Sequence, residues 1–200
     1  MKQRNLLTIA VCAVLLTACI PSVHPFYTDK DLVFDARLLG EWQKKGATGP
    51  LGVWKFEQAA DKVYKLTVTE KEGKQGQFVA CLLMLDGHYF LDIIPTDCGH
   101  VDTQAELLTA SVFPGHLLLH VPQMAPELKL AFFDFGWLTK CLEANPDALA
   151  HHNEGKRTIL TASTADLQRF VLRHIGEGQL FSSPEEMARK AGDAPTAILK

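Results

Sequence analysis

The chain has 200 residues, of which 47% are hydrophobic and 22% charged, and its formal net charge at pH 7 is −3. A chain of this size and composition buries enough surface to fold as one globular domain without stabilising disulfides or metals. A mildly acidic chain without clusters of Lys and Arg argues against nucleic-acid binding, because that binding depends on cations that neutralise phosphates.

The first eighteen residues have the order of a secretory signal, with Lys2 and Arg4 preceding an apolar run. This run is too short for a membrane-spanning helix, which needs about 20 apolar residues. It ends in LTAC at positions 16–19, which resembles the bacterial lipobox. The resemblance implies cleavage before Cys19 and acylation of its thiol and its new amino group. An ordinary cleaved signal and an uncleaved anchor are the alternatives.

Lipidation at Cys19 implies a bacterial envelope protein held on a membrane, since three acyl chains exceed the two signals that durable anchoring requires. In Gram-negative sorting, an Asp directly after the lipidated Cys retains a lipoprotein at the inner membrane. Ile20 occupies that position here, so the resemblance favours the outer membrane. Removal of residues 1–18 would leave 182 residues and move the net charge from −3 to −5.

Three cysteines, Cys81, Cys98 and Cys141, remain once Cys12 leaves with the signal and Cys19 is lipidated. In an oxidising compartment they allow at most one intramolecular disulfide, and the sequence does not choose among the three possible pairs. The alternative is that all three are thiols, one or two of them buried as small apolar groups.

The next part of the chain predicts a tether and then antiparallel strands. Two prolines and the lack of periodicity at 20–31 indicate an extended tether. Alternation at 53–58 and 63–69 predicts half-buried strands. Asp86-Gly87 predicts a tight hairpin, and residues 78–85, apolar on both faces, predict a strand that is central or covered by a helix. Further strands are expected at 107–113, 116–122, 127–133 and 157–161.

Helices are expected late in the chain. Asp134 can cap a short helix at 136–144, and a second is expected from Ser163 to the stop at Gly176. A capping box at 183–186 predicts a third. About eight strands and two or three short helices, mostly C-terminal, predict a mainly β fold, an antiparallel barrel or sandwich.

Gly40-x-Trp42, in FDARLLGEW, resembles the motif that opens the first strand of lipocalins, which implies a lipocalin-like barrel with Trp42 plugging its closed end. Strands followed by a helix also fit that family, although the helix at 136–144 interrupts the strand order. Separately, PFYTDKDLVFDARLLGEW, NPDALAHH and LTASTADLQRFVLRH resemble a set of uncharacterised bacterial lipoproteins over most of the mature chain. We therefore divide the chain into a signal peptide (1–18), a lipidated tether (19–33), a lipocalin-like β domain (34–177) and a helical tail (178–200).

The side chains expected to face the barrel interior are mostly large, which favours a mostly filled interior with at most a shallow mouth. These inward residues are Trp54, Phe56, Tyr64, Leu66, Phe78, Leu82, Leu130 and Phe132.

Three groups of residues are candidate sites. His116 and His120 share a strand face but stand ~13 Å apart, too far to share one metal. The adjacent His151 and His152 point in different directions on any regular element. The loop at 92–102 could bind a divalent cation or build a Cys–His pair, although most such loops are only solvated. Its candidate residues are Asp92, Asp97, Cys98, His100 and Asp102.

No spacing among these residues matches a known mechanism, so the sequence assigns no catalytic residue, no metal and no cofactor. Its leading interpretation is a non-enzymatic envelope lipoprotein whose barrel binds a small apolar ligand or an envelope partner protein. The alternative is a periplasmic-face hydrolase or metal-dependent enzyme that uses the loop at 92–102.

Overall fold

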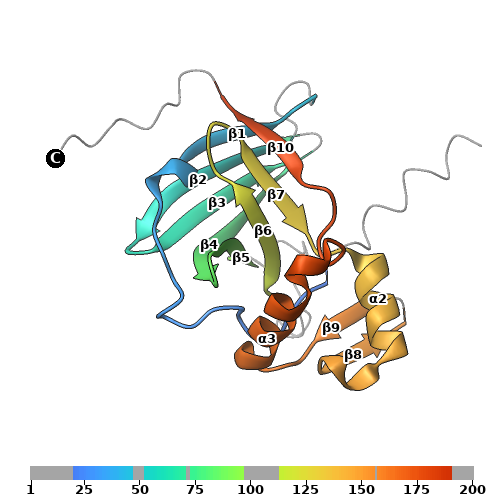
Figure 1. Ribbon diagram of the computed structural model, residues 1–200. Helices are drawn as coiled ribbons and strands as arrows, with labels where there is room; N and C mark the ends of the chain where they lie inside the picture. The colour runs from blue at the N-terminus through green and yellow to red at the C-terminus, as the bar shows by residue number, and fades with distance from the viewer. Residues whose placement is uncertain (1–19, 47–51, 71–72, 97–112, 156, 191–200) are drawn as a thin grey trace, which may run out of the picture.

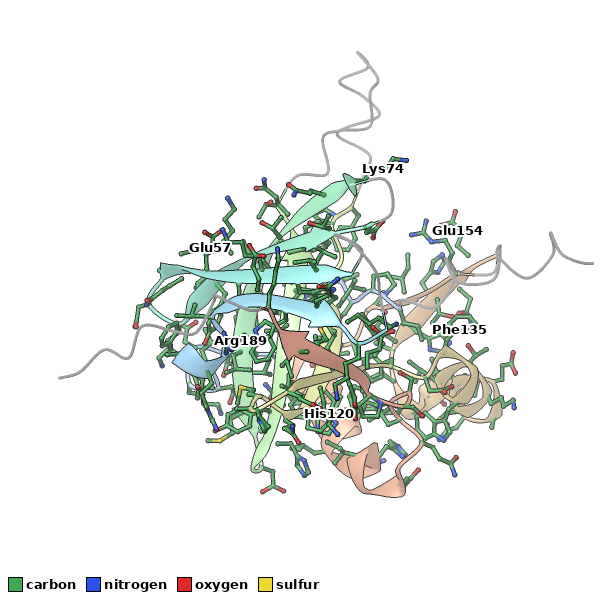
Figure 2. All side chains as sticks on the ribbon, turned by 90° about the horizontal axis from the view of Figure 1, so that it is seen from above. Glu57, Lys74, His120, Phe135, Glu154 and Arg189 are labelled. Carbon is green, nitrogen blue, oxygen red and sulfur yellow. The ribbon has the colours of Figure 1, made fainter. Side chains whose placement is uncertain are left out.

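A closed barrel with a smaller layer of helices and strands packed beside it forms the body of the protein, seen here in a computed structural model (Figure 1). The structure describes residues 20–46, 52–70, 73–96, 113–155 and 157–190. Figure 2, turned by 90°, places Phe135 and Glu154 on the side of that layer and Glu57 on the opposite side of the barrel.

Eight antiparallel strands close the barrel in the order β1-β10-β7-β6-β5-β4-β3-β2, which confirms the expected mainly β, antiparallel fold. The expected helix between the strands does not prevent closure. The strands are β1 (Gly40–Lys44), β2 (Val53–Ala60), β3 (Val63–Thr69), β4 (Gln75–Leu85), β5 (His88–Pro95), β6 (Leu117–Gln123), β7 (Leu128–Phe132) and β10 (Glu185–Arg189).

The remaining elements lie outside the barrel, apart from a 3-10 turn that precedes β1. They are η1 (Ala36–Leu38), α2 (Phe135–Ala144), η3 (Pro146–Ala148), β8 (His151–Glu154), β9 (Arg157–Leu160), α3 (Thr164–His174) and η4 (Ile175–Glu177). Both expected caps are present, because the Asp134 carboxylate accepts the N–H of Trp137 at 2.7 Å and Ser163 caps α3. Among the described residues, no helix has the length and apolar character needed to cross a membrane.

The predicted Asp86-Gly87 hairpin joins β4 to β5. Asp86 and Gly87 have φ angles of 47° and 80°, and Leu85 pairs with His88 across the turn. Two successive positive φ values are what a two-residue hairpin needs, and Asp and Gly tolerate them best. The double-sided apolar run of β4 is also explained, since Leu82 faces the interior while Leu83 packs into an outer core.

The capping box at 183–186 does not begin a helix, which corrects the third predicted helix. Residues from Glu185 form β10, which pairs with β1 on one side and β7 on the other, so the barrel extends beyond the expected boundary at 177. Met187 is buried inside, and Glu186 lies within reach of Lys45 (3.1 Å) and Lys129 (2.9 Å) on the neighbouring strands. Hydrogen bonding to the free edges of both β1 and β7 stabilises the strand more than a four-residue capping box stabilises a helix.

The strand expected at 157–161 is also placed differently from the prediction. It forms β9, which pairs only with β8 in a separate two-stranded sheet outside the barrel. The helix α3 consequently precedes the last barrel strand instead of following it. The strand expected at 107–113 lies, except for Phe113, outside the described residues.

Large side chains fill the barrel interior. All eight predicted inward residues belong to its core, and Phe56, Tyr64, Leu66 and Leu82 are each exposed by 1% or less. Phe56 meets Tyr64 edge-on with ring centroids 6.4 Å apart. These contacts agree with the predicted filled interior.

A second core lies between the outer face of the barrel and the added layer. Leu83, Phe90 and Leu118 contribute from the barrel, and α2, α3 and β9 contribute from outside. Its members from that layer are Leu138, Leu142, Leu149, Leu160, Ala162, Leu167, Phe170 and Val171. The barrel therefore has a hydrophobic outer face that the layer covers, which ties the two parts together.

Residues 20–33 do not form a free tether. Ile20 and Phe26 are buried at 3% and 1% exposure within the outer core. Ser22 exchanges two backbone hydrogen bonds with His116 at the start of the barrel strand β6, and the neighbouring Pro21 and Val23 bond to Leu160 of β9. The segment expected to act as a spacer is thus part of the packed body, because its apolar side chains Ile20 and Phe26 are buried in the outer core.

Trp42 lies in the inner core of the barrel. Trp42 is fully buried, and its indole N–H donates to the carbonyl oxygen of Leu38 at 2.8 Å. The guanidinium of Arg189, from β10, lies 4.1 Å from the centre of the Trp42 ring. This cation–π contact joins the first and last strands of the barrel.

Replacing this tryptophan should therefore destabilise the whole fold. We expect Trp42→Ala to lower the free energy of unfolding by roughly 3–5 kcal/mol, because it empties a buried aromatic site. Urea denaturation measures the change, and Leu172→Ala on the exposed face of α3 is the control with a small effect. A melting transition unchanged by Trp42→Ala would contradict the role given to this residue.

Stability should also depend on the ionisation of His120. Burial against Phe90 and Phe181, with His88 nearby, lowers the pKa of His120 to about 4. An unfolded histidine binds its proton near pH ~6.5, so between about pH 6.5 and 4 the unfolded chain binds more protons than the folded one. The free energy of unfolding should fall as the pH falls through this window.

We expect His120→Phe to flatten this part of the stability–pH curve, because the phenyl ring cannot take up a proton. Urea unfolding at several pH values across the window measures the slope. His152→Phe, at an exposed position of β8, is the control that keeps it. An equal slope in wild type and His120→Phe would assign the acid sensitivity to other groups.

Candidate functional site

Asp92, the first candidate of the loop at 92–102, is a structural residue of β5. Its side chain is 1% exposed, accepts the backbone N–H of Phe26 at 2.8 Å and lies 2.7 Å from Nδ1 of His116. A buried carboxylate is costly unless it is paired, and both partners here meet that need. Asp92 thus holds the segment after Cys19 against the barrel.

The other candidates of that loop, Asp97, Cys98, His100 and Asp102, lie outside the described residues, as does Cys19. Cys81 and Cys141 are both free thiols, so they do not pair with each other. Cys81 is buried beside the Tyr27 hydroxyl, and desolvation raises the pKa of its thiol. A thiol with a raised pKa is a poor nucleophile at neutral pH.

His116 and His120 have separate environments, as their predicted spacing of ~13 Å along one strand indicates. His116 pairs with Asp92, while His120 lies among aromatic rings of the outer core. Within the described ranges, no group of three or more His, Cys, Asp or Glu side chains could hold a metal ion.

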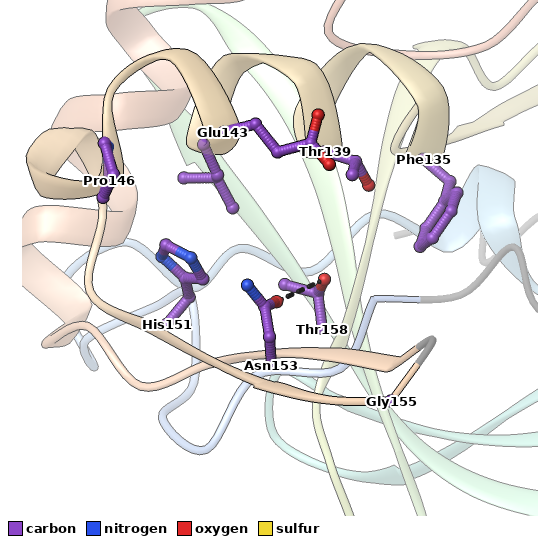
Figure 3. Close-up of a pocket in the computed structure, with 9 residues that line it drawn as sticks. Phe135, Thr139, Glu143, Pro146, His151, Asn153, Gly155 and Thr158 are labelled. Carbon is purple, nitrogen blue, oxygen red and sulfur yellow. Dashed lines mark hydrogen bonds between the residues drawn. The ribbon is translucent and has the colours of Figure 1, made fainter.

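A candidate site lies outside the barrel, in a cleft between α2 and the β8–β9 hairpin (Figure 3). Its volume is about 530 Å³, within the range of small-molecule sites. Phe135, Leu142 and Pro146 supply apolar lining, and polar side chains come from both walls. Figure 3 shows the side chains of α2 facing those of the hairpin across the cleft.

The hairpin wall presents one hydrogen-bond acceptor and one donor. His151 Nδ1 lies 2.8 Å from the Leu149 carbonyl, which can only accept, so Nδ1 carries the proton. In the neutral ring Nε2 is then an acceptor. The Thr158 hydroxyl donates to Asn153 Oδ1 at 2.9 Å, which leaves the Asn153 amide hydrogens available to a ligand.

The helix wall presents two further oxygen groups. Thr139 and Glu143 stand one helical turn apart on α2, so both point towards the same side of the helix. The hydroxyl oxygen of Thr139 is buried without a hydrogen-bond partner among the described residues. Within the same part of the chain, nothing forms an ion pair with Glu143. An unsatisfied buried hydroxyl is uncommon in proteins and costs stability.

Sequence reasoning noticed only His151 of this cleft, as half of an adjacent histidine pair. The expected divergence of that pair is confirmed, since His151 lines the cleft and His152 is exposed. On the other wall, the four-residue spacing of Thr139 and Glu143 on a predicted helix indicates that the two side chains share a helix face. Their meeting with His151 depends on how the hairpin packs against α2, which no local pattern encodes.

The fold and this site define the chain as a closed eight-stranded antiparallel barrel with a cleft-bearing layer inserted between its last two strands. Comparison of the chain with protein-family models, with curated proteins and with solved structures finds no match.

From the Thr139 hydroxyl, which has no hydrogen-bond partner among the described residues, we predict an effect on stability. Thr139→Val keeps the shape and removes the buried oxygen, so it should raise the free energy of unfolding by up to about 1 kcal/mol. Thr158→Val is the matched control across the cleft and should lower it by about 1 kcal/mol, because it breaks the bond to Asn153. Denaturant unfolding of both variants measures this, and a loss of stability in Thr139→Val would mean that its hydroxyl has a partner.

Proposed function

We propose that this chain is a membrane-anchored bacterial envelope lipoprotein without enzymatic activity, which binds a small ligand or an envelope partner outside its filled barrel. The observation that carries the anchoring part is the lipobox-like LTAC at 16–19, and Ile20, directly after Cys19, is buried within the outer core. Contacts made by Ile20 and later residues persist after cleavage before Cys19. The expected mature protein therefore keeps the packing of its first residues.

The lipobox-like LTAC and the resemblance to bacterial lipoproteins support the same proposal from the sequence. Ile20 in place of Asp favours the outer membrane. Three acyl chains, at ~0.8 kcal/mol per buried methylene, would hold the protein durably on the bilayer. Because residues 20–33 are packed rather than extended, the lipid would place the body of the protein directly at the membrane surface.

The binding part of the proposal is drawn from where free space and free polar groups lie. The described interior is filled by large side chains, and the three described cavities are lined by residues between 134 and 184. This distribution favours the added layer as the binding surface and the barrel as its scaffold. A small apolar ligand inside the barrel therefore has less support than a ligand bound outside the barrel.

The enzymatic alternative at 92–102 gains no support from the described residues. Asp92 is occupied by Phe26 and His116, and Cys81, its cross-strand neighbour, is a buried thiol with a raised pKa. A nucleophile needs an accessible, activated group beside a base. We therefore propose a binding protein.

Lipidation is tested by changing Cys19 alone. We expect Cys19→Ser to abolish acylation and to leave an unprocessed precursor, because the acceptor thiol is gone. Intact mass spectrometry and fractionation of inner and outer membranes read the result. Cys12→Ser is the matched control and should give a mature protein of unchanged mass, since residue 12 leaves with the signal. Normal acylation of Cys19→Ser would overturn the anchoring proposal.

A further inference from the structure

We infer that the cleft between α2 and the β8–β9 hairpin binds a small organic cation, an amine with an apolar body. This inference deepens the proposed binding role by naming a site and a ligand class for it. It depends on the hydrogen-bonding and charge inventory of the cleft described above.

Acceptors outnumber donors among the polar groups of the cleft. The Glu143 carboxylate accepts hydrogen bonds, the Nδ1–H tautomer of His151 places its Nε2 as a further acceptor, and the buried Thr139 hydroxyl has no partner among the described residues. The Asn153 amide nitrogen donates, since Thr158 occupies the amide oxygen, and the Thr139 hydroxyl can either donate or accept. An ammonium group, which has several N–H donors and no acceptor, complements this set.

The charge of the cleft also favours a cationic ligand. Glu143 is the charged residue of the described lining, and no other described side chain neutralises it. The described cations next to this region, Lys140 and Arg157, do not line the cleft, and Lys156 lies outside the described residues. Glu143 is exposed at the edge of the cleft, so its carboxylate, which has no described cationic partner, disfavours an anionic ligand by repulsion.

The apolar lining indicates what the rest of the ligand should be. Phe135 stands at one end of the cleft in Figure 3 and Pro146 at the other, and Leu142 also lines the cleft. A volume of about 530 Å³ accommodates an aromatic or short aliphatic body. A bare inorganic cation would use the carboxylate but leave these apolar groups unmatched.

Three probes that share one body and differ in their head group test the inference. They are 2-phenylethylammonium, 2-phenylethanol and 3-phenylpropionate, titrated into the full chain in detergent and followed by calorimetry and amide NMR. We expect the ammonium to bind saturably and at least tenfold more tightly than the alcohol, and the carboxylate not to bind. Amide shifts should concentrate in α2 and β8–β9.

Two variants assign the preference to Glu143. Glu143→Gln should reduce binding of the ammonium to that of the alcohol, while Glu154→Gln, exposed on β8 and outside the lining, should leave it unchanged. Circular dichroism confirms that both variants fold. Equal binding of all probes, shifts outside the cleft, no binding of the ammonium, or binding unaffected by Glu143→Gln would each overturn the inference. None of these results alters the acylation of Cys19, which is measured separately by mass.

Discussion

The pairing of β10 with both β1 and β7 is the interaction on which the rest of this structure depends. Without it, the seven strands from β1 to β7 would form an open sheet with two unpaired edges, which favour aggregation. The pairing places Met187 in the interior and Arg189 over Trp42, so the last strand contributes to the inner core. Barrel closure thus joins residues from the two ends of the described chain.

Closure also determines how the inserted layer is held. The chain leaves the barrel after β7 and returns to it at β10, and the two passages bond to each other. Asp134 N–H donates to the Leu180 carbonyl at 2.9 Å, and Ser182 N–H donates to the Phe132 carbonyl at 2.8 Å. With its start and end joined, the insertion packs α2, α3 and β9 against the outer face of the barrel without breaking the sheet.

This arrangement separates stability from binding. Large side chains fill the barrel interior, whereas the cleft between α2 and the β8–β9 hairpin holds a carboxylate and a hydroxyl that has no hydrogen-bond partner among the described residues. Proteins commonly tolerate such locally unfavourable groups where a ligand is bound. The segment from Ile20 to Phe26, fastened by the buried Asp92, connects the proposed lipid attachment to the same outer layer.

Local patterns in the sequence determined those features of the protein that depend on neighbouring residues. The Asp86-Gly87 turn, the caps Asp134 and Ser163 and the alternation that directs Phe56 and Tyr64 inward were all predictable, since turn angles, capping bonds and strand periodicity are local.

The tertiary structure alone decided the features that depend on partners distant in the chain. The capping box at 183–186 became a strand because two barrel edges required pairing, and 157–160 joined β8 instead of the barrel. Residues 20–33 were expected to be a tether, but an outer core with room for Ile20 and Phe26 buried them. The cleft likewise exists only where α2 meets the hairpin. A local sequence pattern cannot encode these outcomes, because the free energy that decides each comes from contacts between segments far apart in the chain.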